Sequence, residues 1–525
     1  MRKLSLILVL ATSACLDLDV TNPNLPDRSR ATADPFATET VVASSFRTWW
    51  QVAGHDDYPS WAFSTMAREF TSGFADFGQL ETSAEPRGSW NNSPANARRN
   101  VNELPWFTLY RTNSAVTDAL SAFDEGLTIG DATQTLRARA FAKFMQGVAH
   151  GYLGLYFDQA FIADEDLDLD TLTVPNPRPY TEVTAAAIAM LDEAITIAGG
   201  ADFSFPADGW FYTAMTRDEF VRLANSFIAK LMVYSARTPA ERAAVNWPGV
   251  ITRLDAGIVT DFAPIGQVDI IWDDWKRLTA RVRTASRPSD FGRPNYWLIG
   301  PADSTNGFVN WVNTELNSRV AFQMRTQDRR IQGAGGPATP GSYMGYNLNN
   351  IFAASRGTYR YSWYYIHRYG LGTSWQDSPM PAVLVSEMNL LRAEAHIRGG
   401  NAALAVPLIN ATRTANGQLP DVTIDGPPDV AGCVPRKLNG ACGSLWDALR
   451  YEKGIEGIGV DGVTAFFDAR GWQTLPEGTP LHLPIPGSEL ATLQLTNYTF
   501  GGIGAPSSAP APNGEACPVA LARCP

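Results

Sequence analysis

Apolar residues recur at helical spacing through residues 380–417, where the pattern is clearest. The first stripe consists of Leu384, Met388, Leu391 and Ala395. Gly399 and Gly400 end this helix, because glycine readily adopts the left-handed backbone of a helix end. Asn401 is expected to cap a second helix, which Pro407 should kink. The second stripe consists of Leu404, Leu408 and Ala411. Such a short connection predicts two antiparallel helices that must bury their stripes against neighbours.

The first half of the chain carries the same periodicity. It predicts helices over residues 36–52, 59–78, 96–125, 131–157, 180–198, 216–236 and 240–260. In residues 131–157 the inward positions are Phe141, Phe144, Val148, Tyr152 and Leu155. Gly147, Gly151 and Gly154 allow a neighbouring helix to approach closely, at some cost in helix propensity. The helix pairs have no fixed repeat length, so the sequence predicts a mostly α fold, a degenerate helical-repeat scaffold of the tetratricopeptide type.

Helical periodicity fades from about residue 261 to 379, where glycine, proline, asparagine and aromatic residues dominate. A long irregular segment inside a helical scaffold is where binding loops are expected. A further helix is predicted from Ser444 to about Glu456. We expect residues 36–525 to form a single unit. Its helical scaffold would cover about 36–260 and 380–470, and an irregular ligand-side insertion with short strands would cover about 261–379.

The amino terminus has the pattern of an export signal, with two basic residues, a short apolar run and small residues before Cys15. The apolar run is far shorter than the roughly 20 residues that cross a bilayer, and no other stretch is long and apolar enough. Cys15 resembles the acylated cysteine of a lipoprotein, although Thr12 stands where leucine is usual, so simple secretion is the alternative. We expect a lipoprotein-type signal peptide at 1–14 and a polar tether at 15–35.

Composition argues against one class of partner. The net charge is −11 and the pI is about 5.1, whereas nucleic-acid binding needs basic patches. The chain also holds 15 Trp, 17 Tyr and 25 Phe residues. Such an aromatic content is common in sugar- and peptide-binding surfaces, but it also fills large cores. Nucleic acid is therefore not an expected partner.

Four cysteines besides Cys15 lie near the carboxy terminus. They are Cys433, Cys442, Cys517 and Cys524. In an exported protein an even number of cysteines at short spacings favours disulfides. Local pairing would join Cys433 to Cys442 and Cys517 to Cys524, and two less local connectivities are also possible. No Cys-x2-Cys spacing or adjacent histidine supports the alternative, a zinc site.

The sequence contains no Gly-x-Ser-x-Gly elbow, His-Glu-x-x-His pair or phosphate loop. The acidic run 164–170 is not an EF-hand, because Leu169 and Pro175 stand where glycine and glutamate are needed. A solvated loop is expected there, with a looser calcium site as the alternative. Asp56-Asp57 and Asp273-Asp274 are candidate carboxylates for glycoside hydrolysis, but adjacent side chains point apart, which favours structural roles. We expect no catalytic residue, no cofactor and no metal.

Aromatic residues crowd together next to Arg360, His367 and Arg368. These candidate ligand-binding residues are Tyr359, Tyr361, Trp363 and Tyr364, with Tyr369 close behind. Strand alternation would place Tyr359, Tyr361 and Trp363 on one face, so that one face is buried and the other exposed. Aromatic planes stack on sugar rings or peptide side chains. Further candidates in loop-like contexts are Trp90, Trp272 and Trp275. The alternative is that these residues only fill a core.

Three segments carry a family resemblance, in the same order as in the family. The first is Leu-Arg-Ala-Glu-Ala at 391–395 with its helix pair, the second is residues 450–470, and the third is Leu-Pro-Ile-Pro…Glu at 483–489. With the Asp-Leu-Asp-Val-Thr-Asn-Pro run at 17–23, they resemble the SusD/RagB family of nutrient-binding outer-membrane lipoproteins. The second segment departs from the family pattern, because Lys453 replaces an arginine and a second arginine is missing.

The resemblance implies a SusD-like fold, a lipid anchor at Cys15 and a surface-exposed position on the outer membrane. It also implies a SusC-like TonB-dependent transporter barrel as the partner. The protein would capture a glycan or peptide and deliver it to this transporter as a hinged lid, without catalysis. The alternatives are an exported glycosidase-like enzyme on a helical scaffold and a helical-repeat adaptor with no nutrient role.

Overall fold

The computed structural model describes residues 34–54, 59–72, 78–167, 176–265, 292–348, 354–368, 379 and 381–510. Several sequence predictions lie outside these residues. They are the signal peptide at 1–14, Cys15 and most of the tether, Asp56-Asp57, Trp272, Asp273-Asp274, Trp275, Tyr369, Cys517 and Cys524. Within the described residues the fold is mostly α-helical, as the periodicity predicts.

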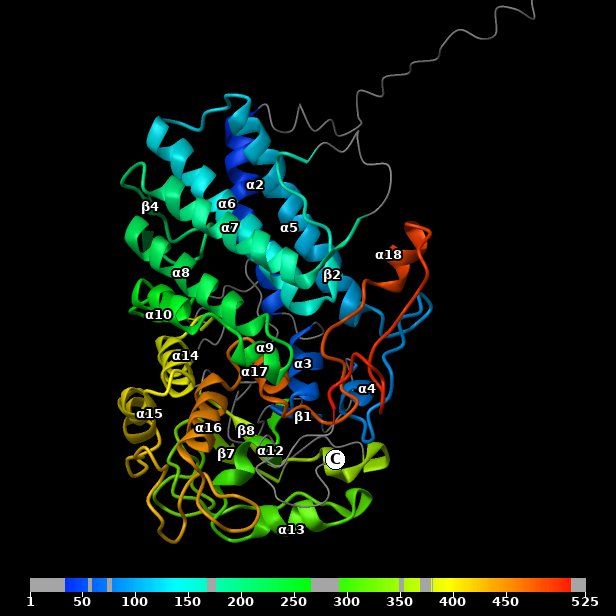
Figure 1. Cartoon of the computed structure of the whole chain (residues 1–525), viewed down its shortest axis with the longest axis vertical. Helices are drawn as coiled ribbons and strands as arrows, with labels where there is room; N and C mark the ends of the chain where they lie inside the picture. Colours follow the sequence, from blue (N-terminus) through cyan, green and yellow to red (C-terminus); the bar gives the residue numbers. More distant parts are fainter. Residues whose placement is uncertain are drawn as a thin grey trace, which may run out of the picture.

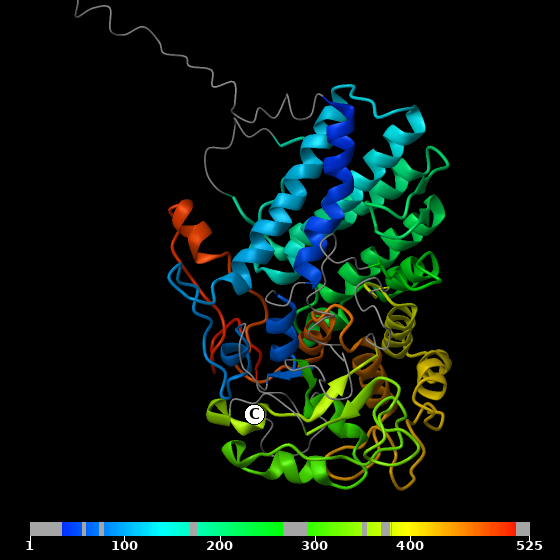
Figure 2. The same ribbon diagram turned by 180° about the vertical axis from the view of Figure 1, so that it is seen from behind.

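Long helices make up the first half of the chain and the upper part of the molecule (Figure 1). They are α2 (Pro35–Gly54), α5 (Asn100–Asp124), α6 (Ala132–Tyr156), α7 (Tyr180–Ala198), α8 (Arg217–Tyr234) and α10 (Trp247–Asp255). Shorter helices between them are α3 (Ser60–Met66), α4 (Gln79–Ser83) and α9 (Pro239–Ala243). Helices that follow one another in the chain pack side by side, and α2 returns against α5, as the view from behind shows (Figure 2).

Two helix boundaries show how local sequence decides the fold. Thr216 and Glu219 form a reciprocal capping box at the start of α8, which satisfies backbone donors that a helix end otherwise leaves unpaired. The predicted helix at 59–78 is wrong beyond Met66. Arg68 has a left-handed backbone with φ +59°, so the helix ends there and the chain continues as the strand β1 (Phe70–Ser72).

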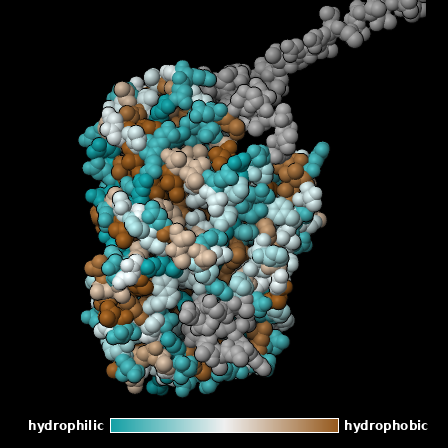
Figure 3. Space-filling model, viewed as in Figure 1, coloured by the Kyte–Doolittle hydropathy of each residue, from teal (hydrophilic) through white to brown (hydrophobic). Residues whose placement is uncertain are grey.

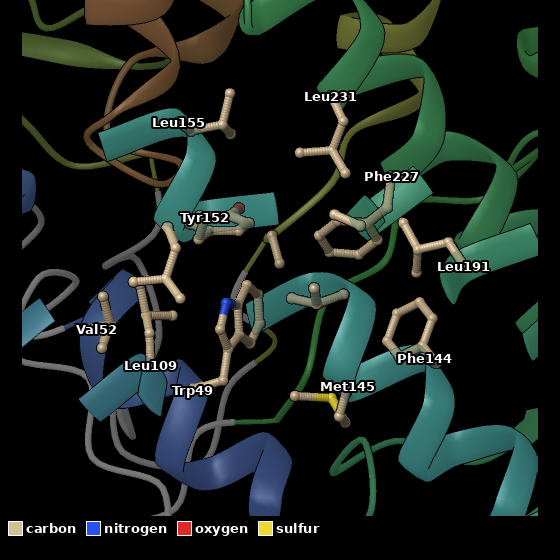
Figure 4. Packing of buried hydrophobic residues seen from close by; sticks show 14 of the residues in the cluster. Trp49, Val52, Leu109, Phe144, Met145, Tyr152, Leu155, Leu191, Phe227 and Leu231 are labelled. Carbon is tan, nitrogen blue, oxygen red and sulfur yellow. The ribbon is translucent and has the colours of Figure 1, made fainter. Parts of the chain in front are cut away.

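The core of the upper part is built on α6, whose five predicted inward residues are all buried. The Trp49 ring of α2 lies 5.3 Å from the Tyr152 ring and 6.0 Å from the Phe227 ring (Figure 4). Gly147 allows close approach as predicted, because a Cβ atom there would lie 2.8 Å from Cγ of Leu191 on α7. Helix α6 therefore packs closely against its neighbours.

Most helices of the second half lie in the lower part of the molecule, whereas the last of them lies higher, at the right side of Figure 1. They are α14 (Val385–Arg398), α15 (Ala402–Ala415), α16 (Leu445–Gly457), α17 (Thr464–Trp472) and α18 (Gly487–Thr492). Helix α14 packs against α10, α15 and α16, so the hairpin predicted at 380–417 continues the helical stack. All four residues predicted for the stripe of α14 are buried.

The stripe predicted for α15 is wrong by one position. Leu404 is 55% exposed, whereas Ala405 and Ile409 are fully buried. Polar contacts help to set this face, since the Thr412 hydroxyl donates to Glu452 of α16 over 3.1 Å. Apolar spacing does not detect such contacts. Asn401 stands at the N-cap position but does not cap α15 with its side chain, which donates to the Gly399 carbonyl over 3.3 Å.

The segment between the helical parts contains short elements, as predicted. They are β6 (Gly292–Pro294), α12 (Tyr296–Ile299), α13 (Gly307–Asn313), β7 (Met344–Tyr346), β8 (Tyr364–Ile366) and single 3-10 turns at Gly300–Ala302, Leu316–Ser318, Ala354–Arg356 and Thr358–Arg360. The described strands form separate two-stranded antiparallel sheets. These are β1 with β6, β2 (Gln159–Ala160) with β3 (Arg178–Pro179), β4 (Ser204–Phe205) with β5 (Met215–Thr216), and β7 with β8.

The predicted aromatic strand covers only Tyr364–Ile366, and residues 358–360 form a 3-10 turn instead. The expected alternation of buried and exposed faces does not occur, because Tyr364, Tyr365 and Ile366 are all buried. Strand β8 pairs with β7 and also contacts β6, which covers residues that a surface strand would expose. In the described chain, no helix combines the length and the hydrophobicity that crossing a membrane would require.

Candidate functional site

A cavity of about 180 Å³ opens between α16 and α17 on one side and the turn after α3 with α12 on the other. We call it the main cleft. Its lining includes Arg68, Trp297, Arg436, Arg450, Tyr451 and Trp472. Aromatic and cationic side chains from distant parts of the sequence therefore meet in one hollow. This combination of apolar planes and hydrogen-bond donors suits a polar organic ligand.

A buried ion-pair network borders the main cleft and joins four helices, α9, α14, α16 and α17. Arg242 donates to both carboxylate oxygens of Glu394, over 2.9 and 2.7 Å, and to Asp468 over 2.8 Å. Lys453 donates to Asp468 over 2.7 Å. Burial alone would raise the pKa of Glu394, but the Arg242 charge outweighs this effect and holds that pKa well below its usual value. The network thus holds α9, α14, α16 and α17 in a fixed relation.

A second network anchors the opposite side of α16. Arg330 donates to Glu452 over 2.6 Å, to Glu456 over 2.8 Å and to Asp328 over 2.7 Å. The Tyr451 hydroxyl donates to Asp328 over 2.6 Å. All four charged groups are buried and paired, which is the condition under which buried charges are tolerated.

The segments that carry the family resemblance converge on these networks. Glu394 belongs to the Leu-Arg-Ala-Glu-Ala run, Lys453 to the Arg450–Glu456 run, and Asp468 to the Phe466–Arg470 run. Arg470 donates to the backbone carbonyls of Leu155, Tyr234 and Leu481. The residues of these family-like segments therefore hold the helices together behind the cleft.

One wall of the main cleft is the pair formed by Arg68 and Trp297. The Arg68 guanidinium lies 4.6 Å from the centre of the Trp297 ring, a cation–π contact. Helix α12 comes close to α16 at this point, since a Cβ atom on Gly454 would lie 2.6 Å from Leu298. On the opposite wall, the Trp472 ring nitrogen donates to Glu394 over 3.1 Å and so fixes the ring.

The rim of the main cleft includes a loop that a disulfide closes between Cys433 and Cys442. Arg436 and Lys437 lie on this loop and line the cleft. Lys437 is 3.6 Å from Asp447, and Arg436 donates to the Asp303 carbonyl over 3.4 Å. The disulfide therefore helps to hold two cationic side chains at the entrance.

Glu69 lines the main cleft next to Arg68 and is almost fully buried. It accepts a hydrogen bond from the Gly459 amide over 3.2 Å. Burial raises the pKa of Glu69 to about 8, and the nearby charge of Asp461 adds to the effect. At neutral pH this side chain is therefore mostly protonated and adds little negative charge to the cleft.

A second cavity of about 20 Å³ adjoins the main cleft and shares Arg68 and Trp297 with it. We call it the arginine pocket, because Arg68, Arg87, Arg319 and Arg360 all line it. Glu85 is the carboxylate of this pocket and lies 2.5 Å from Arg68. Burial lowers the pKa of Arg87 to about 10, the charge of Glu85 opposes this effect, and the charge of Arg68 adds to it.

The structure separates the aromatic residues that the sequence grouped. Tyr359 lines the arginine pocket, with its ring 4.5 Å from the Arg360 guanidinium. Tyr361 and Tyr364 are 8% and 2% exposed, and Trp90 is 6% exposed, so these three rings belong to the interior. Trp363 is partly buried, with its ring 6.1 Å from the Tyr346 ring.

Sequence reasoning missed the two indoles of the main cleft, Trp297 and Trp472. Trp472 stands two residues after the Arg470 of the family-like segment, and that closeness is a signal that could have identified it. Trp297 and Arg68 carry no comparable pattern, because they meet only where β1, which follows Arg68, pairs with β6, which precedes α12. The acidic run predicted to be solvated is partly fixed, since Glu165 is ion-paired with the buried Lys143.

No protein-family model matches the sequence, and comparison with curated proteins finds no match. Solved structures do match. A SusD superfamily protein from Bacteroides vulgatus ATCC 8482 is 16% identical, with a TM-score of 0.54 over 88% of this chain and 97% of that chain. Another from the same organism is 13% identical, with a TM-score of 0.55 over 89% and 99%. A SusD-like carbohydrate binding protein from that organism is 12% identical, with a TM-score of 0.51 over 84% of each chain.

These likenesses extend over more than four fifths of this chain and over nearly the whole of the first two structures. The chain therefore has the SusD fold.

Proposed function

We propose that the protein binds a glycan in the main cleft and does not transform it. The observation that carries this proposal is the meeting of Trp297, Tyr451 and Trp472 with several charged side chains in one cavity of about 180 Å³. Indole faces stack on sugar rings, and charged side chains orient hydroxyl and acidic groups. One structure with the same fold is described as a carbohydrate binding protein, which supports a glycan over a peptide.

Catalysis would require a different arrangement of carboxylates. Glycoside hydrolysis needs two acids on either side of the bond, one protonated and one ionised. In the main cleft Asp468 is held by Lys453 and Arg242, and Asp447 is engaged by the capping box of α16. Asp447 and Asp468 are thus occupied by structural contacts, and Glu69, the third acidic residue of the described lining, is buried and mostly protonated at neutral pH. The described lining therefore lacks a free, ionised second acid. This supports binding and delivery over turnover.

The test compares two tryptophans by isothermal titration with a panel of purified oligosaccharides. Trp297→Ala should weaken binding about tenfold or more, because an aromatic anchor in a cavity carries much of the binding energy. Trp363→Ala is the control, since this ring lies against Tyr346 outside the main cleft. Equal losses in the two variants, or release of shortened sugars by the wild-type protein, would contradict the proposal.

We further propose that the mature chain is anchored at the outer-membrane surface through acylated Cys15 and delivers its glycan to a TonB-dependent transporter barrel of the SusC type. The SusD fold and the sequence resemblance support this role. Radiolabelled palmitate should mark the wild-type protein and leave Cys15→Ser unmarked. A large β-barrel protein should co-purify with the tagged chain from detergent-solubilised outer membranes. An unlabelled wild-type protein in the medium would contradict the anchor.

A further inference from the structure

Positive charge is concentrated in the arginine pocket, although the chain as a whole has a net charge of −11. Four arginines line this pocket together with one carboxylate in the described residues, that of Glu85. Arg68 donates from both Nε and Nη2 to Oε1 of Glu85, over 3.1 and 2.5 Å. Glu85 accepts its hydrogen bonds from Arg68, and its charge also acts on Arg87 and Arg319. One carboxylate thus faces four arginines in the described lining.

The other three arginines donate to uncharged oxygens in the part of the chain that the structure describes. Arg87 donates to the Thr82 carbonyl over 2.5 Å and to the Thr479 hydroxyl over 3.2 Å. Arg319 donates to the carbonyls of Val312 and Thr314, over 2.8 and 3.0 Å.

Arg360 donates to the Ser83 hydroxyl over 2.9 Å and to the Arg356 carbonyl. All four arginines of the pocket are at most 8% exposed. Solvent therefore screens their charges weakly, and their mutual repulsion remains. An anion in the pocket would relieve this repulsion.

The main cleft also has more cationic than acidic residues in its described lining. Its cationic residues are Arg68, Arg436, Lys437, Arg450 and Lys453, and its acidic residues are Glu69, Asp447 and Asp468. Glu69 is mostly protonated at neutral pH, because burial raises its pKa to about 8. Cations therefore outnumber ionised carboxylates in the described lining of both cavities, although in the main cleft Arg68, Lys437 and Lys453 are paired with Glu85, Asp447 and Asp468.

The sizes of the two cavities suit different parts of one ligand. A cavity needs about 10–15 Å³ to hold one water molecule, so the arginine pocket, at about 20 Å³, accepts a small group and excludes a sugar ring. The main cleft, at about 180 Å³, has room for a ring. Arg68 and Trp297 line both cavities, so an acidic group and its ring can occupy them together.

We propose that the glycan is acidic and that its carboxylate or sulfate group enters the arginine pocket while its sugar ring lies in the main cleft. This inference rests on the proposed function. Arginine offers a planar fork of donors that matches a carboxylate or sulfate, and a charge-assisted hydrogen bond is about twice as strong as a neutral one. A neutral glycan would leave the excess charge of the pocket uncompensated.

The test uses titration calorimetry with tetragalacturonate, its carboxyl-reduced neutral counterpart and a sulfated oligosaccharide of similar length. The wild-type protein should bind an acidic sugar about tenfold or more tighter than the neutral one, and added salt should weaken that preference. Arg360→Gln should remove most of the preference, whereas Arg360→Lys should retain part of it; the affinity of each variant for the neutral sugar is measured in parallel. Arg329→Gln is the matched control, because Arg329 donates to the Gln332 and Gly333 carbonyls outside both cavities.

The outcomes separate the two proposals. Equal affinity for the acidic and neutral sugars would overturn the acidic assignment and leave glycan binding intact. Loss of the preference in Arg329→Gln would overturn it as well. Binding of the sulfated sugar but not the uronate supports the assignment and identifies sulfate as the group. Binding of a polyaspartate peptide in place of every sugar would overturn the proposed function itself. The salt dependence of the wild-type protein decides the question if Arg360→Gln does not fold.

Discussion

Replacing Arg242 with methionine tests whether the buried network behind the main cleft determines the stability of the fold. Methionine keeps an unbranched, apolar stem and removes only the charge and the donors. Arg242 is fully buried and makes three charge-assisted hydrogen bonds, two to Glu394 and one to Asp468, as well as one to the Val233 carbonyl over 3.0 Å. Its loss leaves two buried carboxylates with less compensation.

Breaking a buried ion pair by removing one partner typically costs about 3–5 kcal/mol. We expect the lower end, about 3 kcal/mol, because partial compensation remains. Lys453 still donates to Asp468 over 2.7 Å, and Arg398 still donates to Glu394 over 2.8 Å. The loss should be read from the midpoint of equilibrium urea unfolding, followed by tryptophan fluorescence, with the slope of the transition unchanged.

The matched control is Arg178→Met, which removes an ion pair between Arg178 and Glu182 whose side chains are 44% and 46% exposed. An exposed ion pair of this kind contributes about 0.2–1 kcal/mol. If Arg242→Met lost no more stability than this control, the proposed role of the network would be refuted.

The pH dependence gives an independent check through Glu394. Its pKa is depressed in the folded protein, so its contribution to stability is present above its ordinary value of 4.5 and is lost as the pH falls through the folded pKa. In Arg242→Met that depression is largely removed. The difference in stability between wild type and variant should therefore shrink as the pH falls below 4.5. A difference that is constant with pH would contradict the assignment to Glu394.

Three further predictions concern other parts of the structure. The pKa of Glu69 is raised from 4.5 to about 8, so between these pH values the folded state keeps a proton that the unfolded state loses. Stability should therefore fall as the pH rises from 4.5 to about 8. Glu69→Gln should flatten this pH dependence, measured by urea unfolding. Gly147→Ala should lower the melting temperature, because the new Cβ would lie 2.8 Å from Leu191 and overpacking costs about 1–3 kcal/mol. Cys442→Ser should weaken glycan affinity by freeing the loop that holds the cleft rim, with a smaller effect on the melting temperature.

Each of these predictions has its own control. Asp218→Asn, at an exposed carboxylate, should leave the fall in stability between pH 4.5 and about 8 unchanged. Gly88→Ala should cost little, since nothing lies within 4 Å of a Cβ atom there. Unchanged affinity in Cys442→Ser would contradict a role of the loop in binding.

The helices were predictable where one face of each is buried throughout its length. Helix α7 begins and ends at the residues that the periodicity predicts, Tyr180 and Ala198. Burial there is apolar, so the spacing of apolar residues reports it directly. The stripe of α15 was predicted one position out because Thr412 packs inward through a polar contact with Glu452. Apolar periodicity misses a face that polar groups share.

The candidate site was less predictable for a related reason. The sequence favoured Tyr361, Trp363 and Tyr364 because they are close together in the chain, but Tyr361 and Tyr364 are buried. Trp297 and Trp472 are far apart in the sequence and meet only where α12 and α17 border the same cavity. Closeness in sequence indicates a shared element, whereas a binding cavity is formed between elements.

By itself the sequence determined the helical class, the order of the main helices and the resemblance to a family, since these depend on local spacing and on short segments read along the chain. Only the tertiary structure decided that Glu394, Lys453 and Asp468 form one buried network and that arginines from four separate segments surround one small pocket. The physical reason is that electrostatic interactions act through space, between groups whose separation in the chain does not determine their distance.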